Sequence, residues 1–188
     1  MTRPLLDDLY SDAELTPDGI YRYRLRRAVG SEVLDGPRAS TLLWVMLNPS
    51  TADARADDPT IRKVVGFTRR EGFTQAEVVN LYAFRATEPD DLWAAEWRGV
   101  DVVGRLNDAT LGGTIAAADA VVLAWGAAPA SARRRASFAR RVDVVVKLLP
   151  GLSAEQGRAR CLGTTSGGDP RHPLFVRSAA PLEPWSPR

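Results

Sequence analysis

The chain of 188 residues is poor in cysteine, lysine and histidine. Cys161 is its only cysteine, so an internal disulfide and a metal cluster held by several cysteines are excluded. Lys63 and Lys147 are the only lysines, so nearly all positive charge is arginine, whose planar guanidinium suits contacts to phosphate and carboxylate. A GC-rich coding sequence produces the same bias. The net charge of +2 therefore permits a nucleic-acid or nucleotide partner without requiring one.

Long apolar runs are missing as well. No segment approaches the roughly 20 apolar residues needed to cross a bilayer, and the first ten residues lack the basic-then-apolar pattern of a signal peptide. Repeats and low-complexity linkers are also lacking, and an apolar content of 45% suits a folded domain. We therefore expect a cytoplasmic protein with no membrane partner. Its oligomeric state is open, and a monomer is favoured. Its single domain covers residues 20–188, after a loose, polar arm over residues 1–19.

Several segments have the patterns of strands. Residues 20–29 alternate apolar side chains with arginine, which is typical of a half-buried strand. A continuous apolar run, typical of a strand buried on both faces, covers residues 41–47, and residues 76–82 and 120–125 are predicted as the second and third core strands. Residues 160–162 form a short last strand.

Helices are predicted between these strands. Asp58 is a good N-cap and Pro59 suits the first helical position, so a helix begins there, and Glu71-Gly72 ends it. Further helices are predicted at residues 89–97, 101–118 and within 127–149. Strands that alternate with helices indicate one three-layer α/β domain, with a central, mainly parallel sheet covered by helices.

Polar residues follow the predicted core strands. Asn48, Pro49 and Ser50 come after the first, residues 80–87 lie at and after the second, and Gly126 follows the third. His172 lies in a loop after the last short strand. Because ligands bind at the carboxyl ends of the strands in such sheets, we expect these loops to form one working surface.

Two of these residues can carry chemistry. The Asn48 amide can hold a nucleophilic water in place, or the residue can simply form a turn with Pro49. His172 is the only histidine and lies in a loop rich in glycine and proline. A neutral His172 can donate one hydrogen bond to a developing oxyanion, and a protonated one can offset negative charge; a surface histidine without a function is the alternative.

Other polar residues suit ligand contacts. Asn80 lies in a buried strand, so its amide must find partners on a ligand ring or on the neighbouring loop. Arg85 and Thr87 suit phosphate, and Tyr82 can stack on a base or pack in the core. Ser50 can cap a helix or bind a ligand.

Two charged clusters have simple explanations. Asp53, Asp57 and Asp58 can hold magnesium together with substrate phosphates, but helix capping explains part of this acidic loop. The arginines at 133–135 are expected on a helix and are most simply a solvated face. We expect no metal and no cofactor.

The motifs MLNPSTAD, DDPTIRK, VVNLYAFRATEP, LAWG and GDPRHPLF resemble an uncharacterised bacterial and phage family, a domain of unknown function, from about Tyr21 to Phe175. Their order is similar, more distantly, to the uracil-DNA glycosylase superfamily, particularly its mismatch-specific thymine/uracil branch. There, an apolar strand ends in Gly-x-Asn-Pro-Gly, whose asparagine positions the attacking water. Asn48 matches that asparagine, whereas Met46 and Ser50 replace the two glycines.

Two further segments carry this resemblance. Residues 80–89 are similar to a segment of that branch reading Thr-Asn-hydrophobic-x-x-Arg-Thr-Thr-Pro. The residues from His172 to Phe175 match a late His-Pro-Ser-Pro loop, which in the superfamily enters the minor groove and supports the flipped nucleotide. The serine and the second proline are absent here, and Leu174 or Phe175 takes the place of an apolar wedge.

The resemblance implies a DNA glycosylase-like protein that hydrolyses or binds the N-glycosidic bond of a (modified) base in DNA or a nucleotide. In that hypothesis Asn48 orients water toward the sugar C1′, His172 stabilises the departing base anion, Asn80 recognises the base and Arg85 binds phosphate. The residues predicted to bind substrate are Pro49, Ser50, Asn80, Tyr82, Arg85, Thr87, Gly126 and Leu174. Two alternatives stay open: a non-catalytic nucleic-acid or nucleotide-binding module, and a small-molecule hydrolase of nucleosides or phosphorylated metabolites.

Overall fold

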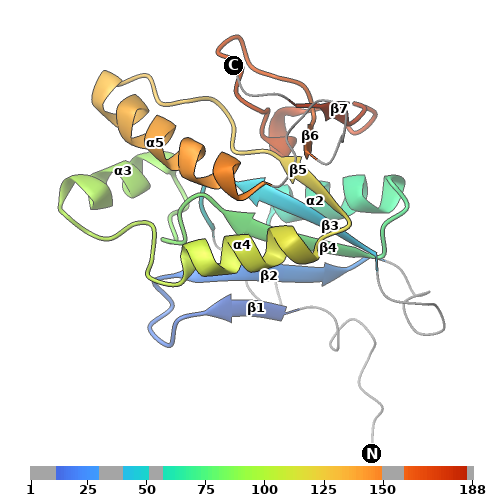
Figure 1. Ribbon diagram of the computed structural model, residues 1–188, viewed down its shortest axis with the longest axis horizontal. Coiled ribbons are helices and arrows are strands. Elements are labelled where there is room, and N and C mark those ends of the chain that lie inside the picture. Colours follow the sequence, from blue (N-terminus) through green and yellow to red (C-terminus); the bar gives the residue numbers. More distant parts are fainter. Residues whose placement is uncertain (1–11, 30–39, 51–56, 150–158, 186–188) are drawn as a thin grey trace, which may run out of the picture.

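The computed structural model describes residues 12–29, 40–50, 57–149 and 159–185, and this part of the chain is built around a seven-stranded mixed sheet (Figure 1). The strand order is β1-β2-β4-β3-β5-β6-β7. The central strands β4, β3, β5 and β6 run parallel, while β1, β2 and β7 pair antiparallel at the edges. The strands are β1 Asp12–Leu15, β2 Arg22–Ala28, β3 Thr41–Met46, β4 Gln75–Asn80, β5 Ala120–Leu123, β6 Ala159–Cys161 and β7 Glu183–Pro184. The predicted mainly parallel α/β sheet is therefore confirmed.

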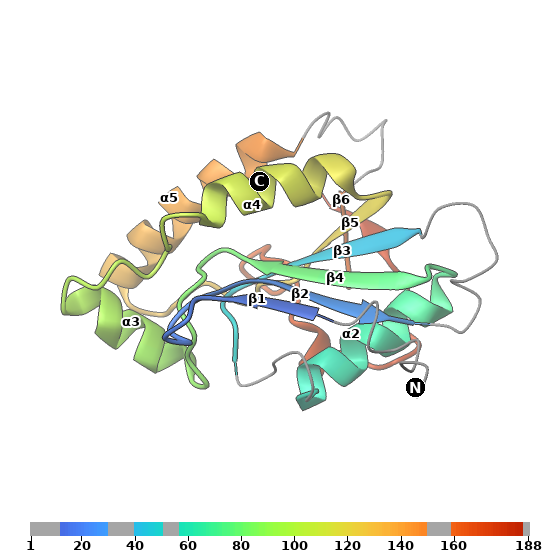
Figure 2. The same cartoon turned by 90° about the horizontal axis from the view of Figure 1, so that it is seen from below.

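Helices cover both faces of the sheet and make a three-layer domain. Figure 2 shows α4 and α5 on one side of the sheet and α2 on the other. The helices are α2 Pro59–Arg70, α3 Pro89–Trp97, α4 Asn107–Ala117, α5 Ala132–Leu148 and the short 3-10 helix η2 Pro173–Phe175. Within the described ranges, no helix combines the length and apolarity that a membrane crossing needs.

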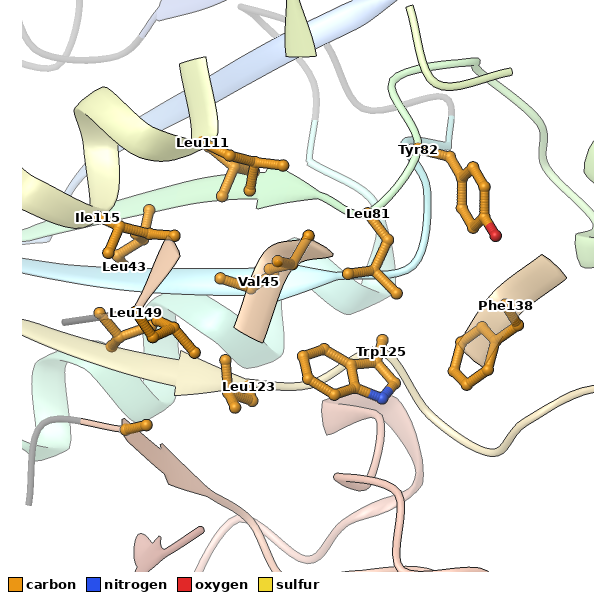
Figure 3. Packing of buried hydrophobic residues seen from close by; sticks show 14 of the residues in the cluster. Leu43, Val45, Leu81, Tyr82, Leu111, Ile115, Leu123, Trp125, Phe138 and Leu149 are labelled. Atoms are coloured by element: carbon orange, nitrogen blue, oxygen red, sulfur yellow. The ribbon is translucent and has the colours of Figure 1, made fainter. Parts of the chain in front are cut away.

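Strand β3 explains why both faces need cover. Its alternating side chains divide between two cores. Leu43 and Val45 share one core with residues of α3, α4 and α5, and Figure 3 shows them with Leu111 and Ile115 of α4; Trp44 belongs to the other core, with α2. Burying each large apolar side chain stabilises the fold by roughly 1.5–3 kcal/mol. The Trp44 indole N–H also donates to the Thr68 hydroxyl at 3.0 Å, so its polar atom is satisfied inside the core.

Helix α2 begins and ends as its sequence predicts. The Asp58 carboxylate accepts from the Ile61 N–H at 2.8 Å, and Pro59 occupies the first turn. After the helix, Gly72 adopts a φ of 79°, a left-handed conformation that glycine reaches without strain.

Two predictions need correction. Residues 12–15 are not part of a loose arm; they form β1, which pairs with β2, because an edge strand depends on its partner more than on its own apolar pattern. The helix predicted from Asp101 begins only at Asn107. The Asp101 carboxylate instead accepts from the N–H groups of Val103 and Gly104, both at 3.1 Å, and closes a turn in which Gly104 has a φ of 84°.

Candidate functional site

A cavity of about 650 Å³ opens where the winding of the sheet reverses. From β3 the chain crosses to β4 on one side, whereas β5 lies on the other side of β3. The loops after these strands diverge at such a switch point and leave a crevice at the carboxyl ends. Residues after β3 and β5, Asn80 at the end of β4, and the loop of His172 all line this cavity.

The cavity brings together most of the residues predicted for the site. It is lined by Asn48, Ser50, Asn80, Thr87, Gly126, His172 and Leu174. The loops after β3 and β4 run side by side beyond the sheet, since Leu81 N–H donates to the Met46 carbonyl at 2.8 Å and Ala86 N–H to the Pro49 carbonyl at 2.9 Å. The convergence expected from strand order is therefore present in the fold.

The Asn48 side chain joins these two loops. Its Nδ2 donates to the Ala86 carbonyl at 2.8 Å and to the Pro49 carbonyl at 3.0 Å. Both amide hydrogens are thereby used, which fixes the orientation of the amide. Within the described ranges, Oδ1 receives no hydrogen bond, so Asn48 offers the half-enclosed cavity an acceptor rather than a donor.

His172 presents a neutral imidazole to the same cavity. Burial lowers the pKa of His172 to about 4, and the nearby Asp58 carboxylate acts in the opposite direction. Its Nδ1 accepts from the Leu174 N–H at 3.3 Å, so the proton of the neutral ring lies on Nε2, which becomes a donor. Gly126, with a φ of 85°, packs close behind, because a Cβ there would lie 3.4 Å from the His172 Cβ.

Asn80 places a further donor at the base of the cavity. Its side chain is 1% exposed, and its Nδ2 has no hydrogen-bond partner among the described residues. A buried N–H without a partner costs roughly 1–3 kcal/mol, so the position favours a ligand that accepts from it. The backbone beneath is held by Asn107, whose Nδ2 donates to the carbonyls of Asn80 and Leu81 at 3.1 and 3.0 Å.

Three predicted site residues lie outside the cavity lining. Pro49 is buried beside the loop junction. Tyr82 is buried in the core against Trp93, with ring centroids 5.5 Å apart, and burial raises the pKa of its hydroxyl. Arg85 donates to the carbonyls of Ser50 and Gly19 at 3.3 and 3.1 Å, so it braces loops around the site.

The cavity also contains residues beyond those predicted to bind substrate; of these, Phe175 was expected only as the alternative to Leu174 for the apolar wedge. Arg22 lines it although only 2% of the residue is exposed, and Trp93 and Trp125 supply aromatic walls. Arg134 joins them from α5, and Phe175 is 82% exposed at the cavity. The sequence pattern predicts a half-buried strand over residues 20–29, which includes Arg22. In such an alternating strand the arginines are expected on the solvent side, so the pattern did not predict that Arg22 lines a cavity.

The acidic loop is only partly described, because Asp53 lies outside the described residues. Asp58 caps α2 and also accepts from the Ser50 hydroxyl, and Asp57 forms an ion pair with Arg27 at 2.7 Å. Where the structure describes the chain, no three histidine, cysteine or acidic side chains gather closely enough to hold a metal ion. Helix capping is therefore confirmed for Asp58.

A mixed sheet with a parallel centre, helices on both faces and a cavity with several polar side chains at its switch point define an α/β protein with a ligand-sized cleft. Within that class, the chain belongs to the family described as "Protein of unknown function (DUF1643)", which matches residues 22–174. No curated protein and no solved structure matches the chain. The more distant resemblance to uracil-DNA glycosylases stays a prediction.

Proposed function

We propose that the protein is a DNA glycosylase-like hydrolase, which cleaves the N-glycosidic bond of a base held in the cavity. The observation that carries the proposal is the orientation of Asn48. Its amide hydrogens bind two loop carbonyls, and its Oδ1 is left to the cavity. A carbonyl oxygen in that position can accept a hydrogen bond from water and direct the water's lone pair toward the sugar C1′.

His172 suits the second half of the reaction. Cleavage leaves negative charge on the departing base, and a positioned N–H donor stabilises such charge best in a site shielded from water. The Nε2 of His172 can supply this donor over the whole neutral range, because the pKa of about 4 keeps the ring uncharged.

The rest of the cavity supports a planar ligand with oxygen acceptors. Trp93 and Trp125 provide apolar ring surface, and Asn80 has an unused donor. A base in a duplex is not accessible to such a cavity, so a DNA substrate would have to present it extruded or unpaired.

The test is base release from single- and double-stranded oligonucleotides that carry uracil, mismatched thymine or modified pyrimidines, in the presence of a chelator. We expect release by the parent chain and a loss of roughly a hundredfold or more in Asn48→Ala. Oligonucleotide binding and the thermal unfolding midpoint serve as controls, because the same variant also lacks the two hydrogen bonds that join the loops. Unchanged turnover in Asn48→Ala would sink the role of Asn48.

A non-catalytic binding module is the second candidate, favoured by the structural use of the Asn48 amide, which joins the loops whether or not chemistry occurs. It predicts salt-sensitive retention of oligonucleotides by the parent chain without base release. A requirement for a divalent ion would instead favour the small-molecule hydrolase, with the acidic loop as metal ligand.

A further inference from the structure

A second hollow lies beside the cavity, between α3 and the N-terminal half of α5. It has a volume of about 520 Å³, and Figures 1 and 2 both show the two helices side by side. Trp93, Ser131 and Arg134 line both this groove and the cavity, so they form the wall between the two. A chain-like ligand with one unit in the cavity can therefore extend across these shared residues into the groove.

The groove contains an exposed aromatic platform. Trp97 is 68% exposed, whereas the other four tryptophans are buried. The Arg133 guanidinium lies 3.8 Å from the centroid of the Trp97 ring and covers one face of it. The large exposed area leaves ring surface available to a ligand, and the cation–π contact with Arg133 holds a positive charge beside it.

Positive charge surrounds this platform. Among the described residues, four arginines line the groove: Arg98, Arg133, Arg134 and Arg140. The carboxylate of Glu96 in the same lining accepts from the Ser137 hydroxyl, and Asp90, which lines the neighbouring cavity, pairs with Arg134 at 2.6 Å. The excess of guanidinium groups favours a polyanion that also carries flat rings.

We propose that the groove binds single-stranded nucleic acid adjoining the base in the cavity, with an unpaired base stacked on Trp97 and phosphates on the arginines. This inference rests on the proposed function, because it treats the cavity as the site of a base. Stacking combined with a basic groove is how proteins hold single strands without reading sequence. A paired base hides its faces, so the groove selects unpaired strands.

The test is the affinity of the full chain for a fluorescent single-stranded oligonucleotide and for its duplex. We expect Trp97→Ala to weaken the single strand at least about fivefold, and Trp97→Phe to restore part of the affinity. The affinity falls as salt rises, so a plot of log affinity against log salt has a negative slope. Arg133→Ala or Arg140→Ala should make this slope shallower by about 0.7 for each phosphate that is no longer neutralised. Arg160→Ala, an exposed arginine of β6 outside both hollows, is the matched control and should leave both quantities unchanged.

Tryptophan fluorescence reports the stacking itself. The difference between parent and Trp97→Ala spectra isolates the exposed indole, and the single strand should quench that difference signal. Equal affinity of Trp97→Ala and parent, equal affinity for duplex, or equal competition by a polyglutamate peptide would each overturn the proposal. The two proposals can fail separately. If Trp97→Ala binds the single strand more weakly but the parent chain releases no base, only the glycosylase proposal fails. If the parent chain releases a base but Trp97→Ala binds the single strand as tightly as the parent, only the proposal for the groove fails.

Discussion

His172 is the only histidine in the chain, so its titration can be followed in a one-dimensional proton NMR spectrum. Its burial places the pKa near 4, well below the ordinary value of 6.5. We expect a midpoint in that low range. Asp58→Asn should lower the midpoint further, because it removes the negative charge that favours the imidazolium while keeping the oxygen that caps α2. A midpoint near 6.5 would show that the ring is solvated.

The same shift predicts how stability depends on pH. The unfolded chain takes up a proton at His172 near pH 6.5, but the folded chain does so only near pH 4. The folded state therefore loses stability as pH falls between these values, by at most about 2 kcal/mol between roughly pH 7 and 5. Urea unfolding at both pH values should show this extra loss in the parent and not in His172→Gln.

Among the elements, the end of β4 depends on two helices. Asn107, the first residue of α4, donates to the Asn80 and Leu81 carbonyls, and Arg141 of α5 donates to Leu81 and pairs with Asp108. These contacts hold the backbone that carries the Asn80 side chain. The position of Asn80 in the cavity is therefore set by helices that follow it in the sequence.

We expect Asn107→Ala to lower the free energy of unfolding by about 1–3 kcal/mol, because the buried carbonyls of Asn80 and Leu81 each lose a hydrogen bond from its amide, although Leu81 keeps its bond from Arg141. It should also weaken ligand binding, since Asn80 is then less firmly placed. Thr110→Ala on the same helix is the control, and its loss of one exposed hydrogen bond to the Leu106 carbonyl should change stability by no more than about 0.5 kcal/mol. Denaturant unfolding measures the free energy of unfolding of the two variants, and equal effects would contradict the role of Asn107.

At the scale of the whole molecule, the fold extends beyond the segment that the family match covers. Residues 183–184 form β7 and add to the sheet, and Trp185 returns to the core after the match has ended at residue 174. Its ring meets Trp125 edge to face, with centroids 5.7 Å apart, and Trp125 lines the cavity. The C-terminal segment thus supports one wall of the site.

Trp185→Ala should destabilise the protein by about 3–5 kcal/mol, because it removes a buried ring and leaves a void against Trp125. Trp97→Ala removes the same side chain from an exposed position and should leave the thermal unfolding midpoint nearly unchanged. Comparable midpoints for the two variants would mean that the C-terminal segment does not contribute to the core.

The sequence by itself predicted the alternating elements, the limits of α2 and the gathering of Asn48, Asn80, Gly126 and His172 at one end of the sheet. These features follow from local chemistry: apolar periodicity, an aspartate before a proline, and polar residues directly after buried runs. The sequence also placed Tyr82 and Arg85 in the site, because they follow a buried strand, but the structure places both outside the cavity lining. Residue type and sequence neighbours do not reveal which way a side chain turns after a strand ends.

Tertiary structure alone decided those directions. Tyr82 turns into the core toward Trp93, Arg85 reaches back 66 positions to Gly19, and Arg22 faces the cavity despite its alternating strand. The Oδ1 of Asn48 is left to the cavity because Ala86, 38 positions away, and Pro49 accept the two amide hydrogens. Such assignments depend on which distant groups compete for each polar atom, and that competition exists only once the chain has folded.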